Sequence, residues 1–450
     1  MAGLDHPRQG ALVADEVRLA DELLESPWPH PGGERRIGRN GLVEERLGGV
    51  GTGSAARHRP IMMPAMDQNL RTPGPTPIPR EVRDAQARQM IDHRGTEFGE
   101  MLRETSAGIG ALIGSSGEVF LLTGSGTGAM EAAVVNVLSP GDRVLVVTIG
   151  AFGDRFAKIA SVFGADVERF EVEWGSAADP DELRRHLSHA APYRAVLITH
   201  NETSTGVMNP LEAMAAVVRD APGEPLLVVD GISGLGAMTF EMDAWGIDLV
   251  VSASQKAWMA SPGIAIAALG RRTVEAGESA RMPRYYWDFA QAREFAPKGQ
   301  TPWTPGISVL YGLRVGVRRL RDEGRERTWR RHAAIAAGVG AGLEALGLKL
   351  VAPPRDRSHT VTAAWLPDGI EWAPFNAAMR ADGLVIAGGQ GKWTGRILRF
   401  GHMGDVAIEE LAQALELMGR VLPRHGHPAD AAQAGRAARE AFEAATAPAR

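Results

Sequence analysis

The sequence predicts an α/β fold, in which a mostly parallel sheet lies between helices and a smaller αβ domain follows. Short runs rich in Val, Leu and Ile alternate with helical stretches from residue 72 onward, which is typical of parallel strands buried on both faces. A long helical tract then leads into a second segment of mixed strands and helices. With 450 residues and 44% hydrophobic composition, the chain can bury one large core and one smaller core.

The elements of the large domain follow one another along the chain. The proline-rich segment 72–79 predicts a stiff, extended stretch, and a helix is expected over residues 80–90. Strands are expected at Val119–Leu122, Arg143–Thr148, Asp166–Val172, Ala195–Thr199, Leu226–Val229 and Leu249–Val251. Ligands of such sheets bind at the carboxyl ends of the strands, so we expect the functional residues directly after these runs.

The second segment begins with the helical tract Ile307–Leu346, which is interrupted near Gly324. Its expected strands are Thr360–Trp365, Leu384–Ile386 and Ile397–Phe400. The sequence therefore predicts four parts: a poorly ordered extension at 1–65, a large domain at 66–323, a small domain at 324–422 and an alanine-rich tail at 423–450.

Composition argues against several classes of function. The formal net charge is -5 and both signs are mixed along the chain, so no surface for nucleic acid is expected. The chain has no cysteine, which excludes disulfides, thiolate metal sites and a cysteine nucleophile, and no metal site is expected. No apolar run reaches the ~18 residues of a membrane span, and the first residues do not resemble a signal peptide. A cytoplasmic protein without a membrane partner is expected.

Lysine is rare in this chain, which has five lysines and 44 arginines. A lysine is therefore a candidate for chemistry that an always-protonated guanidinium cannot perform. Lys256 follows the run Leu249–Val251, and Asp230 ends the run that begins at Leu226, so neighbouring strand ends would bring the two together. An aldehyde cofactor with a pyridine ring needs such an amine and such a carboxylate. Each residue alone is also explained as a surface lysine or a helix cap, but the pair favours the cofactor.

A glycine-rich segment, Leu122–Met130, runs from a strand through a turn into a helix. Backbone N–H groups at a helix N-terminus favour an anion, most simply a phosphate. Gly124, Gly126 and Ala129 also satisfy the G-x-G-x-x-A fingerprint of dinucleotide-binding proteins, so a nicotinamide-dependent oxidoreductase is an alternative. The fingerprint requires an acidic residue about 20 positions further on, at the end of the second strand. The stretch Val147–Gly153 contains no acidic residue.

Three further positions carry candidate binding side chains. Phe152 stands between two glycines after a strand, where an aromatic ring can stack on a flat cofactor. The polar run Thr199–Gly206 suits hydrogen bonds to a ring hydroxyl. Arg399 alternates with apolar residues on a strand of the small domain, and an inward guanidinium is a bidentate clamp for a carboxylate. Each position also has an explanation without a ligand: Phe152 as a core residue, the run Thr199–Gly206 as capping residues, and Arg399 as an exposed strand residue.

Eight motifs, in order along the chain, resemble one family. They are Thr-Pro-Gly-Pro-Thr at 72–76, His-Arg-Gly-Thr-Glu-Phe at 93–98, Thr-Gly-Ser-Gly-Thr-Gly at 123–128, His-Asn-Glu-Thr-Ser-Thr-Gly at 200–206, Val-Asp-Gly at 229–231, Ser-Gln-Lys at 254–256, Thr-Pro-Trp-Thr-Pro at 301–305 and Leu-Arg-Phe-Gly-His-Met-Gly at 398–404. On these motifs the chain resembles the class V aminotransferases of fold type I, and among them the alanine–glyoxylate and serine–glyoxylate aminotransferases. The resemblance covers residues 72–404.

This resemblance implies a seven-stranded type of sheet and pyridoxal 5′-phosphate as the cofactor. Lys256 would carry the cofactor as a Schiff base, Asp230 would pair with the ring nitrogen, and Arg399 would bind the substrate α-carboxylate. The other implied binding residues are Phe152 and Ile232 on the faces of the ring, Thr203 at the ring hydroxyl, Ser125, Gly126, Thr127 and Gln255 at the phosphate, and Thr301 and Thr304 from a second subunit. An obligate homodimer with shared active sites follows.

The implied reaction moves the amino group of a small L-amino acid, namely serine, alanine or aspartate, to glyoxylate or pyruvate. It would follow a ping-pong mechanism with Lys256 as the general base. Alternatives within the cofactor class are a 2-aminoethylphosphonate aminotransferase and a lyase; cysteine desulfurases need a cysteine that the chain lacks. The alternative from another class is the dinucleotide-dependent oxidoreductase.

Overall fold

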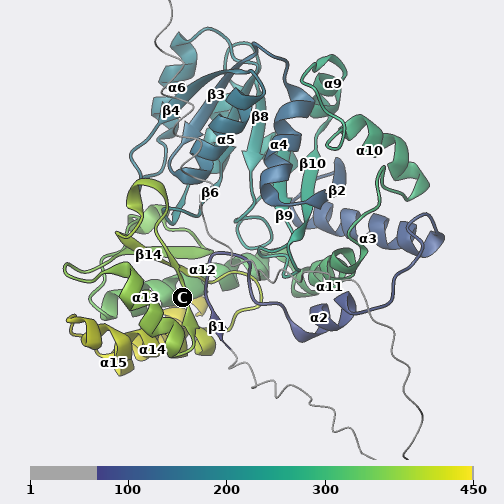
Figure 1. Cartoon of the computed structure of the whole chain (residues 1–450). Helices are drawn as coiled ribbons and strands as arrows, with labels where there is room; N and C mark the ends of the chain where they lie inside the picture. Colours follow the sequence, from purple (N-terminus) through teal and green to yellow (C-terminus); the bar gives the residue numbers. More distant parts are fainter. Residues whose placement is uncertain (1–67, 448–450) are drawn as a thin grey trace, which may run out of the picture. The chain divides into compact units, whose positions relative to one another are not determined.

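Seven strands form the central sheet in the order β2-β10-β9-β8-β5-β3-β4 (Figure 1). A computed structural model describes residues 68–447, so the predicted extension at 1–65 lies outside the described residues. The strands are β1 Asn69–Leu70, β2 Glu118–Gly124, β3 Arg143–Thr148, β4 Asp166–Glu171, β5 Ala195–Thr199, β6 Asn201–Glu202, β7 Val207–Met208, β8 Leu226–Asp230, β9 Leu249–Ala253, β10 Gly263–Leu269, β11 Val361–Trp365, β12 Leu384–Val385, β13 Ala387–Gly388 and β14 Ile397–Gly401.

The helices connect these strands and cover both faces of the large sheet. They are α2 Arg80–Gln86, α3 Thr96–Leu112, α4 Gly126–Val137, α5 Ala151–Val162, α6 Pro180–His189, α7 Leu211–Arg219, α8 Met242–Trp245, α9 Arg271–Ser279, α10 Phe289–Phe295, α11 Ile307–Glu323, α12 Arg325–Ala345, α13 Trp372–Ala381, α14 Ile408–Val421 and α15 Ala431–Thr446. Short 3-10 helices lie at Ala296–Lys298, Pro354–Asp356, Gly391–Trp393 and Leu422–His425.

Two apolar cores lie on opposite faces of the large sheet because successive side chains of a strand point to opposite faces. Along β3, Leu145 and Val147 join the core formed with α3, α7 and α11. Their neighbours Val144 and Val146 join the core under α4, α5 and α9. β3, β4, β5, β8 and β9 run parallel, whereas β10 is antiparallel to both β9 and β2. The predicted α/β fold with a mostly parallel, seven-stranded sheet is confirmed.

The clearest differences from the sequence expectation concern β10 and α2. β10 was not predicted, because its sequence Gly-Ile-Ala-Ile-Ala-Ala-Leu is rich in Ala and Gly, which have low strand propensity. Its position between β2 and β9 supplies the pairing that favours a strand. The helix expected over 80–90 ends at Gln86. The carbonyl of Gln89 instead accepts a hydrogen bond of 2.9 Å from the hydroxyl of Tyr311 on α11, outside any helical pattern.

The C-terminal αβ segment has its own core and its own sheet. β14 lies in the middle of a three-stranded antiparallel sheet between β11 and β13. α12, α13 and α14 supply about half of the residues of this core. α15 packs against α12 and α14, so most of the alanine-rich segment at 423–450 is helical (Figure 1). α11 ends and α12 begins on either side of Gly324, near the predicted domain boundary, and the four-part division itself stays a prediction.

Among the helices of residues 68–447, none is long and apolar enough to cross a membrane.

Candidate active site

A cavity of about 160 Å³ lies at the carboxyl ends of β5, β8 and β9, where the N-termini of α4 and α5 meet them. The residues that line it are Ser125, Gly126, Thr127, Phe152, Arg155, Asn201, Thr203, Asp230, Ile232, Ser233, Gln255 and Lys256. Every predicted cofactor-binding residue except Thr301 and Thr304 belongs to this set. Parallel strands bring their carboxyl ends to one edge of the sheet, and this edge therefore collects side chains that lie far apart in the sequence.

Lys256 and Asp230 reach the cavity from neighbouring strands, because β8 and β9 pair in parallel. The Lys256 ammonium donates a hydrogen bond of 2.6 Å to the carbonyl of Pro73. Burial lowers the pKa of Lys256 to about 8, and the negative charge of Asp230 opposes this shift. Burial likewise raises the pKa of Asp230 to about 7, although the Ile232 N–H donates to its Oδ1 at 2.9 Å. Both groups can therefore exchange protons near neutral pH, as catalytic groups must.

The proline-rich segment at 72–76 forms one wall around Lys256. Gly74 has a φ of +126°, and a Cβ at this position would overlap the Lys256 amine. Thr76 holds the turn that carries the lysine: its Oγ1 donates to the Lys256 carbonyl at 3.1 Å, and its N–H donates to the Gln255 carbonyl at 3.2 Å. The sequence indicated only an extended stretch and a motif here. The glycine between two prolines was the available signal, since only glycine readily adopts a positive φ.

The glycine-rich turn before α4 leaves backbone N–H groups open to the cavity. Ser125 is the N-cap of α4, and its Oγ accepts a hydrogen bond of 3.3 Å from the Gly128 N–H. A Cβ on Gly126 would lie 2.8 Å from the side chain of Ile232, so a larger residue does not fit. The predicted phosphate loop therefore presents a helix N-terminus with its positive dipole end, which favours an anion.

Phe152 and Ile232 both line the cavity with apolar side chains. Phe152 lies in the first turn of α5, and Ile232 is fixed by its backbone hydrogen bond to Asp230. The hydroxyl of Thr203 donates to the hydroxyl of Ser233 at 2.8 Å, and both side chains are buried. Ser233 is a polar neighbour that the sequence did not single out. These positions suit a flat ring with one polar substituent.

Glu202 is a fully buried carboxylate that the sequence did not single out. It accepts hydrogen bonds of 3.1 Å from the Phe152 and Gly153 N–H groups and of 2.6 Å from the Ser204 hydroxyl. A carboxylate at a helix N-terminus is favourable, and this one fixes the turn of α5 that presents Phe152. Burial raises the pKa of Glu202. Its only sequence signal was its place in the polar run 199–206.

Arg155 is a second cavity residue that the sequence missed. It lies one turn after Phe152 on α5, and its Nη1 donates a hydrogen bond of 3.2 Å to the Thr127 hydroxyl. The guanidinium carbon lies 4.7 Å from the centre of the Phe152 ring. In a chain with 44 arginines, nothing in the sequence distinguished this one.

Arg399 is buried on β14, beside the cavity rather than in its wall. Its Nη1 donates to the carbonyl of the cavity residue Thr203 at 3.2 Å, and its Nε donates to the Gly388 carbonyl at 2.7 Å. Burial lowers the pKa of Arg399 to about 10, and Glu202 opposes this shift. The guanidinium thus stays positive at neutral pH, next to the cavity, as a carboxylate-binding group requires.

Thr301 and Thr304 do not line the cavity of their own chain. The Thr301 hydroxyl donates to the Trp303 carbonyl at 2.7 Å, and Thr304 is exposed. Within one chain, the structure therefore does not bring these two predicted residues to the site.

Two buried oxygens in the cavity wall lack a hydrogen-bond partner among the described residues, namely Gln255 Oε1 and Asn201 Oδ1. Buried polar groups without partners are rare in proteins, so this wall suits a ligand that carries polar substituents. An amine, a carboxylate, two apolar walls and a helix N-terminus surround the same space. This donor set fits a flat heteroaromatic aldehyde with a phosphate group.

Comparison with known proteins gives one consistent family. The profile of the family described as "Aminotransferase class-V" matches residues 72–396. The protein named soluble hydrogenase, small subunit, of Synechococcus sp. is 37% identical over 361 residues, which is 80% of this chain and 94% of that protein. The L-aspartate–glyoxylate aminotransferase of Paracoccus denitrificans is 35% identical over 380 residues, 83% of this chain and 96% of that protein.

Among solved structures, the ureidoglycine–glyoxylate aminotransferase of Bacillus subtilis superposes with a TM-score of 0.79. It is 28% identical, and the match covers 84% of this chain and 98% of that chain.

Proposed function

Since this chain belongs to the class V aminotransferases, which use pyridoxal phosphate, we propose that it transfers the amino group of a small L-amino acid to glyoxylate. Serine, alanine and aspartate are the proposed donors, and pyruvate is the next choice of acceptor. The observation that carries the proposal is the placement of Lys256 and Asp230 at the ends of two neighbouring parallel strands, in one cavity wall. Family membership removes the dinucleotide-dependent oxidoreductase. The chain also has no cysteine to ligate an iron–sulfur centre of the kind that hydrogenases use.

Pyridoxal phosphate, when bound, supplies a protonated pyridine ring that withdraws electrons from the Cα of the amino donor. Lys256 would hold the cofactor through its Nζ, and Asp230 would face the ring nitrogen. A positive charge opposite Asp230 favours its ionised form, so the pKa that burial raises to about 7 would fall when the ring is in place. Asp230 would then remain a carboxylate throughout the reaction and keep the proton on the ring nitrogen.

Lys256 would also act as the general base that removes the Cα proton. Its pKa of about 8 leaves part of the amine unprotonated at neutral pH, so the amine can accept a proton and later return it. The Pro73 carbonyl, which accepts the Nζ hydrogen bond, holds this amine at one wall of the cavity. Transfer to the second substrate would then proceed after the first product leaves, as a ping-pong mechanism.

Arg399 would orient the donor by binding its α-carboxylate. Its Nη1 and Nε are already held by the carbonyls of Thr203 and Gly388, so the guanidinium is fixed before a substrate binds. A preorganised guanidinium loses little entropy when it binds a carboxylate.

A homodimer with shared active sites is the proposed assembly. Tyr285 and Tyr286 are exposed by 70% and 42%, and both stack on Trp303 between Thr301 and Thr304. Exposed aromatic side chains of this size mark protein interfaces. This patch would bring the two threonines to the cavity of a second copy. Size-exclusion chromatography with light scattering should give a dimer for the wild-type chain and a larger monomer fraction for Tyr285→Asp.

The reaction is tested by absorbance spectroscopy of the purified chain with pyridoxal phosphate. We expect a visible band that changes on addition of one of the three donors and returns with glyoxylate. Lys256→Ala should lack the band, whereas Lys158→Ala, which removes an exposed lysine on α5, should keep it. A wild-type chain that binds no cofactor, or whose band no amino donor alters, would sink the proposal.

A further inference from the structure

Arg155 stands beside the phosphate loop without a charged partner of its own. Its Nη1 hydrogen bond of 3.2 Å ends on Thr127, which lies in the first turn of α4. Among residues 68–447, no carboxylate lies within ion-pair distance of Arg155; its neighbour Asp154 pairs with Arg169 instead, at 3.1 Å. A guanidinium without an acid partner can form strong, charge-assisted hydrogen bonds with a phosphate or a carboxylate.

The charges of the cavity wall point to the same anion. Its basic side chains are Arg155 and Lys256, and the proposed reaction reserves Lys256 for the cofactor aldehyde and the Cα proton. A phosphate monoester carries roughly -1.5 to -2 charges at neutral pH. The N-terminus of α4 supplies only about +0.5. The hydroxyls of Ser125 and Thr127 add hydrogen bonds but no charge.

The guanidinium is also held in place before any ligand binds. It lies over the ring of Phe152, at 4.7 Å from the ring centre, and α5 fixes both residues one turn apart. The buried Glu202 in turn anchors the N-terminal turn of this helix. Stacking on an aromatic face restrains an otherwise flexible side chain, so the entropy lost on binding a phosphate is smaller.

We propose that Arg155 binds the cofactor phosphate and closes the phosphate loop from the side of α5. The inference rests on the proposed pyridoxal phosphate site. Thr127 would then be shared: its hydroxyl accepts from Arg155 and its backbone N–H faces the same anion. The positive charge of Arg155 also helps to lower the pKa of Lys256 and favours the ionised form of Asp230.

The test compares two ligands that differ only in the phosphate, pyridoxal phosphate and pyridoxal, by titration of the cofactor-free protein. Arg155→Gln should weaken binding of pyridoxal phosphate by about 10- to 100-fold, the range for one charge-assisted hydrogen bond. Binding of pyridoxal should stay within about twofold of the wild type. The affinity of Arg155→Lys for pyridoxal phosphate should lie between those of the wild type and Arg155→Gln, because lysine keeps the charge but loses the bidentate geometry of the guanidinium.

Lys158→Gln is the matched control, since it removes one positive charge from the exposed side of the same helix. It should leave both affinities unchanged, and the urea midpoints of both glutamine variants should equal that of the wild type. Equal losses for the two ligands in Arg155→Gln, or no loss for pyridoxal phosphate, would overturn the inference alone. A wild-type chain that binds neither ligand would overturn the proposed function and this inference with it.

Discussion

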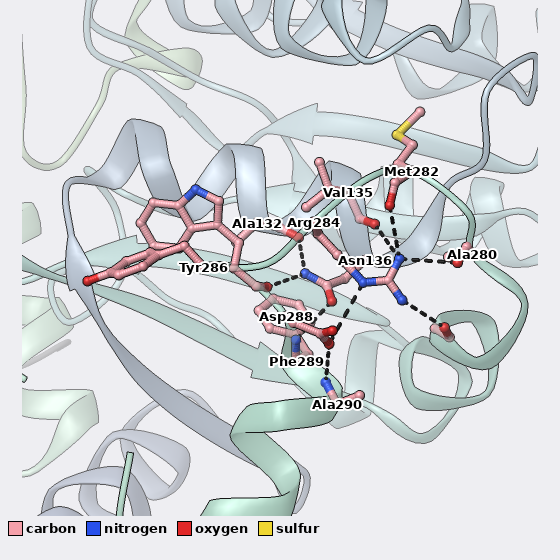
Figure 2. Close-up of polar contacts among 12 residues, drawn as sticks. Ala132, Val135, Asn136, Ala280, Met282, Arg284, Tyr286, Asp288, Phe289 and Ala290 are labelled. Atoms are coloured by element: carbon pink, nitrogen blue, oxygen red, sulfur yellow. Dashed lines mark hydrogen bonds and ion pairs between the residues drawn. The ribbon is translucent and has the colours of Figure 1, made fainter. Parts of the chain in front are cut away.

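The two ends of helix α4 differ in the hydrogen bonds that they form with the rest of the chain. At the C-terminal end, Arg284 Nη1 donates to the Val135 carbonyl at 3.0 Å (Figure 2). Asn136 donates to the Trp287 carbonyl at 2.6 Å and accepts from the Phe289 N–H at 2.9 Å. A cation placed on the last carbonyls of a helix compensates the negative end of its dipole. Arg284 Nε has no hydrogen-bond partner among the described residues, but it forms an ion pair of 3.8 Å with the carboxylate of Asp288. Residues of the same chain therefore hold this end.

At the N-terminal end, the chain supplies one cap and leaves the rest open. Ser125 satisfies one N–H, while Gln255 Oε1 and Asn201 Oδ1 have no partner among the described residues. Asp230 is 3% exposed and its pKa is raised to about 7 by burial. The same helix thus has one end whose carbonyl groups are bound by a guanidinium of this chain, and one end that faces a cavity with two unpartnered oxygens in its wall.

Trp287 links the two ends. Its carbonyl belongs to the Asn136 network, while its ring packs against the phosphate loop: a Cβ on Gly128 would lie 2.6 Å from the ring. Its indole N–H donates to Glu131 on the outer side of α4 at 3.1 Å. The contacts at the C-terminal end of α4 (the structural end) therefore help to position Trp287 against its N-terminal end (the ligand end). Variants at each end can measure how strongly a change at one end alters stability and cofactor affinity at the other.

The largest effect is expected from Asp230→Asn at the ligand end. Removing one partner of a buried ion pair costs about 3–5 kcal/mol, so affinity for pyridoxal phosphate should fall roughly 10²- to 4 × 10³-fold. Asp248→Asn is the matched control, because Asp248 is also buried but lies at the amino end of β9. Spectrophotometric titration of both variants checks this. An equal loss of affinity in the two variants would mean that the effect of Asp230→Asn is not specific to the cavity.

The next effect concerns the pH dependence of the cofactor-free protein. Asp230 has a folded pKa of about 7, above its unfolded value of about 3.9, so the folded state binds the proton more tightly. Asp230 therefore costs stability at pH 8, and this cost disappears as the pH falls below 7 towards 4. Relative to the wild type, Asp230→Asn should be more stable by up to about 4 kcal/mol at pH 8 and by only about 1.5 kcal/mol at pH 5. Urea unfolding of both proteins at the two pH values measures the difference; parallel pH profiles would contradict it.

A smaller effect is expected from Asn136→Ala at the structural end. The change leaves the partly buried Trp287 carbonyl and the buried Phe289 N–H without partners, which should destabilise the protein by about 2–3 kcal/mol. Pyridoxal phosphate affinity should fall by less than about tenfold, since only the packing of Trp287 connects the two ends. Chemical denaturation measures the loss of stability, and titration with pyridoxal phosphate measures the loss of affinity. A loss of affinity as large as that of Asp230→Asn would show that Trp287 couples the ends rigidly.

The smallest effect is expected from Ser125→Ala. Loss of an N-cap costs about 1 kcal/mol of stability. Because the same hydroxyl faces the proposed phosphate site, Ser125→Ala should also weaken the binding of pyridoxal phosphate more than the binding of pyridoxal. Denaturation and titration of this variant against Ser279→Ala, a serine at the far end of α9, test the point. If the two variants have the same affinities for both ligands, Ser125 does not bind the cofactor phosphate.

Much of the fold and site follows from local sequence patterns. Short runs rich in Val, Leu and Ile predicted most of the parallel strands, because strands buried on both faces must be largely apolar. The rule that ligands bind at strand ends then selected Lys256 and Asp230, and the rarity of lysine strengthened the choice. β10 escaped prediction because its alanine-rich sequence becomes a strand only through pairing with β2 and β9.

Glu202 and Arg155 escaped prediction for a related reason. Their contacts depend on where α5 begins relative to the β5 strand end and to α4, which no local pattern encodes. Thr301 and Thr304 were named from a resemblance, and a single chain does not bring them to its own cavity.

The sequence by itself therefore determined the layers, the strand ends and the pair Lys256 and Asp230, since periodicity and residue chemistry are local properties. Only the tertiary structure decided which polar groups stay without partners, which charges meet at the phosphate loop, and how far burial moves the pKa values of Lys256 and Asp230. Burial and hydrogen-bond satisfaction depend on contacts between segments distant in the chain, and these exist only once the chain is folded.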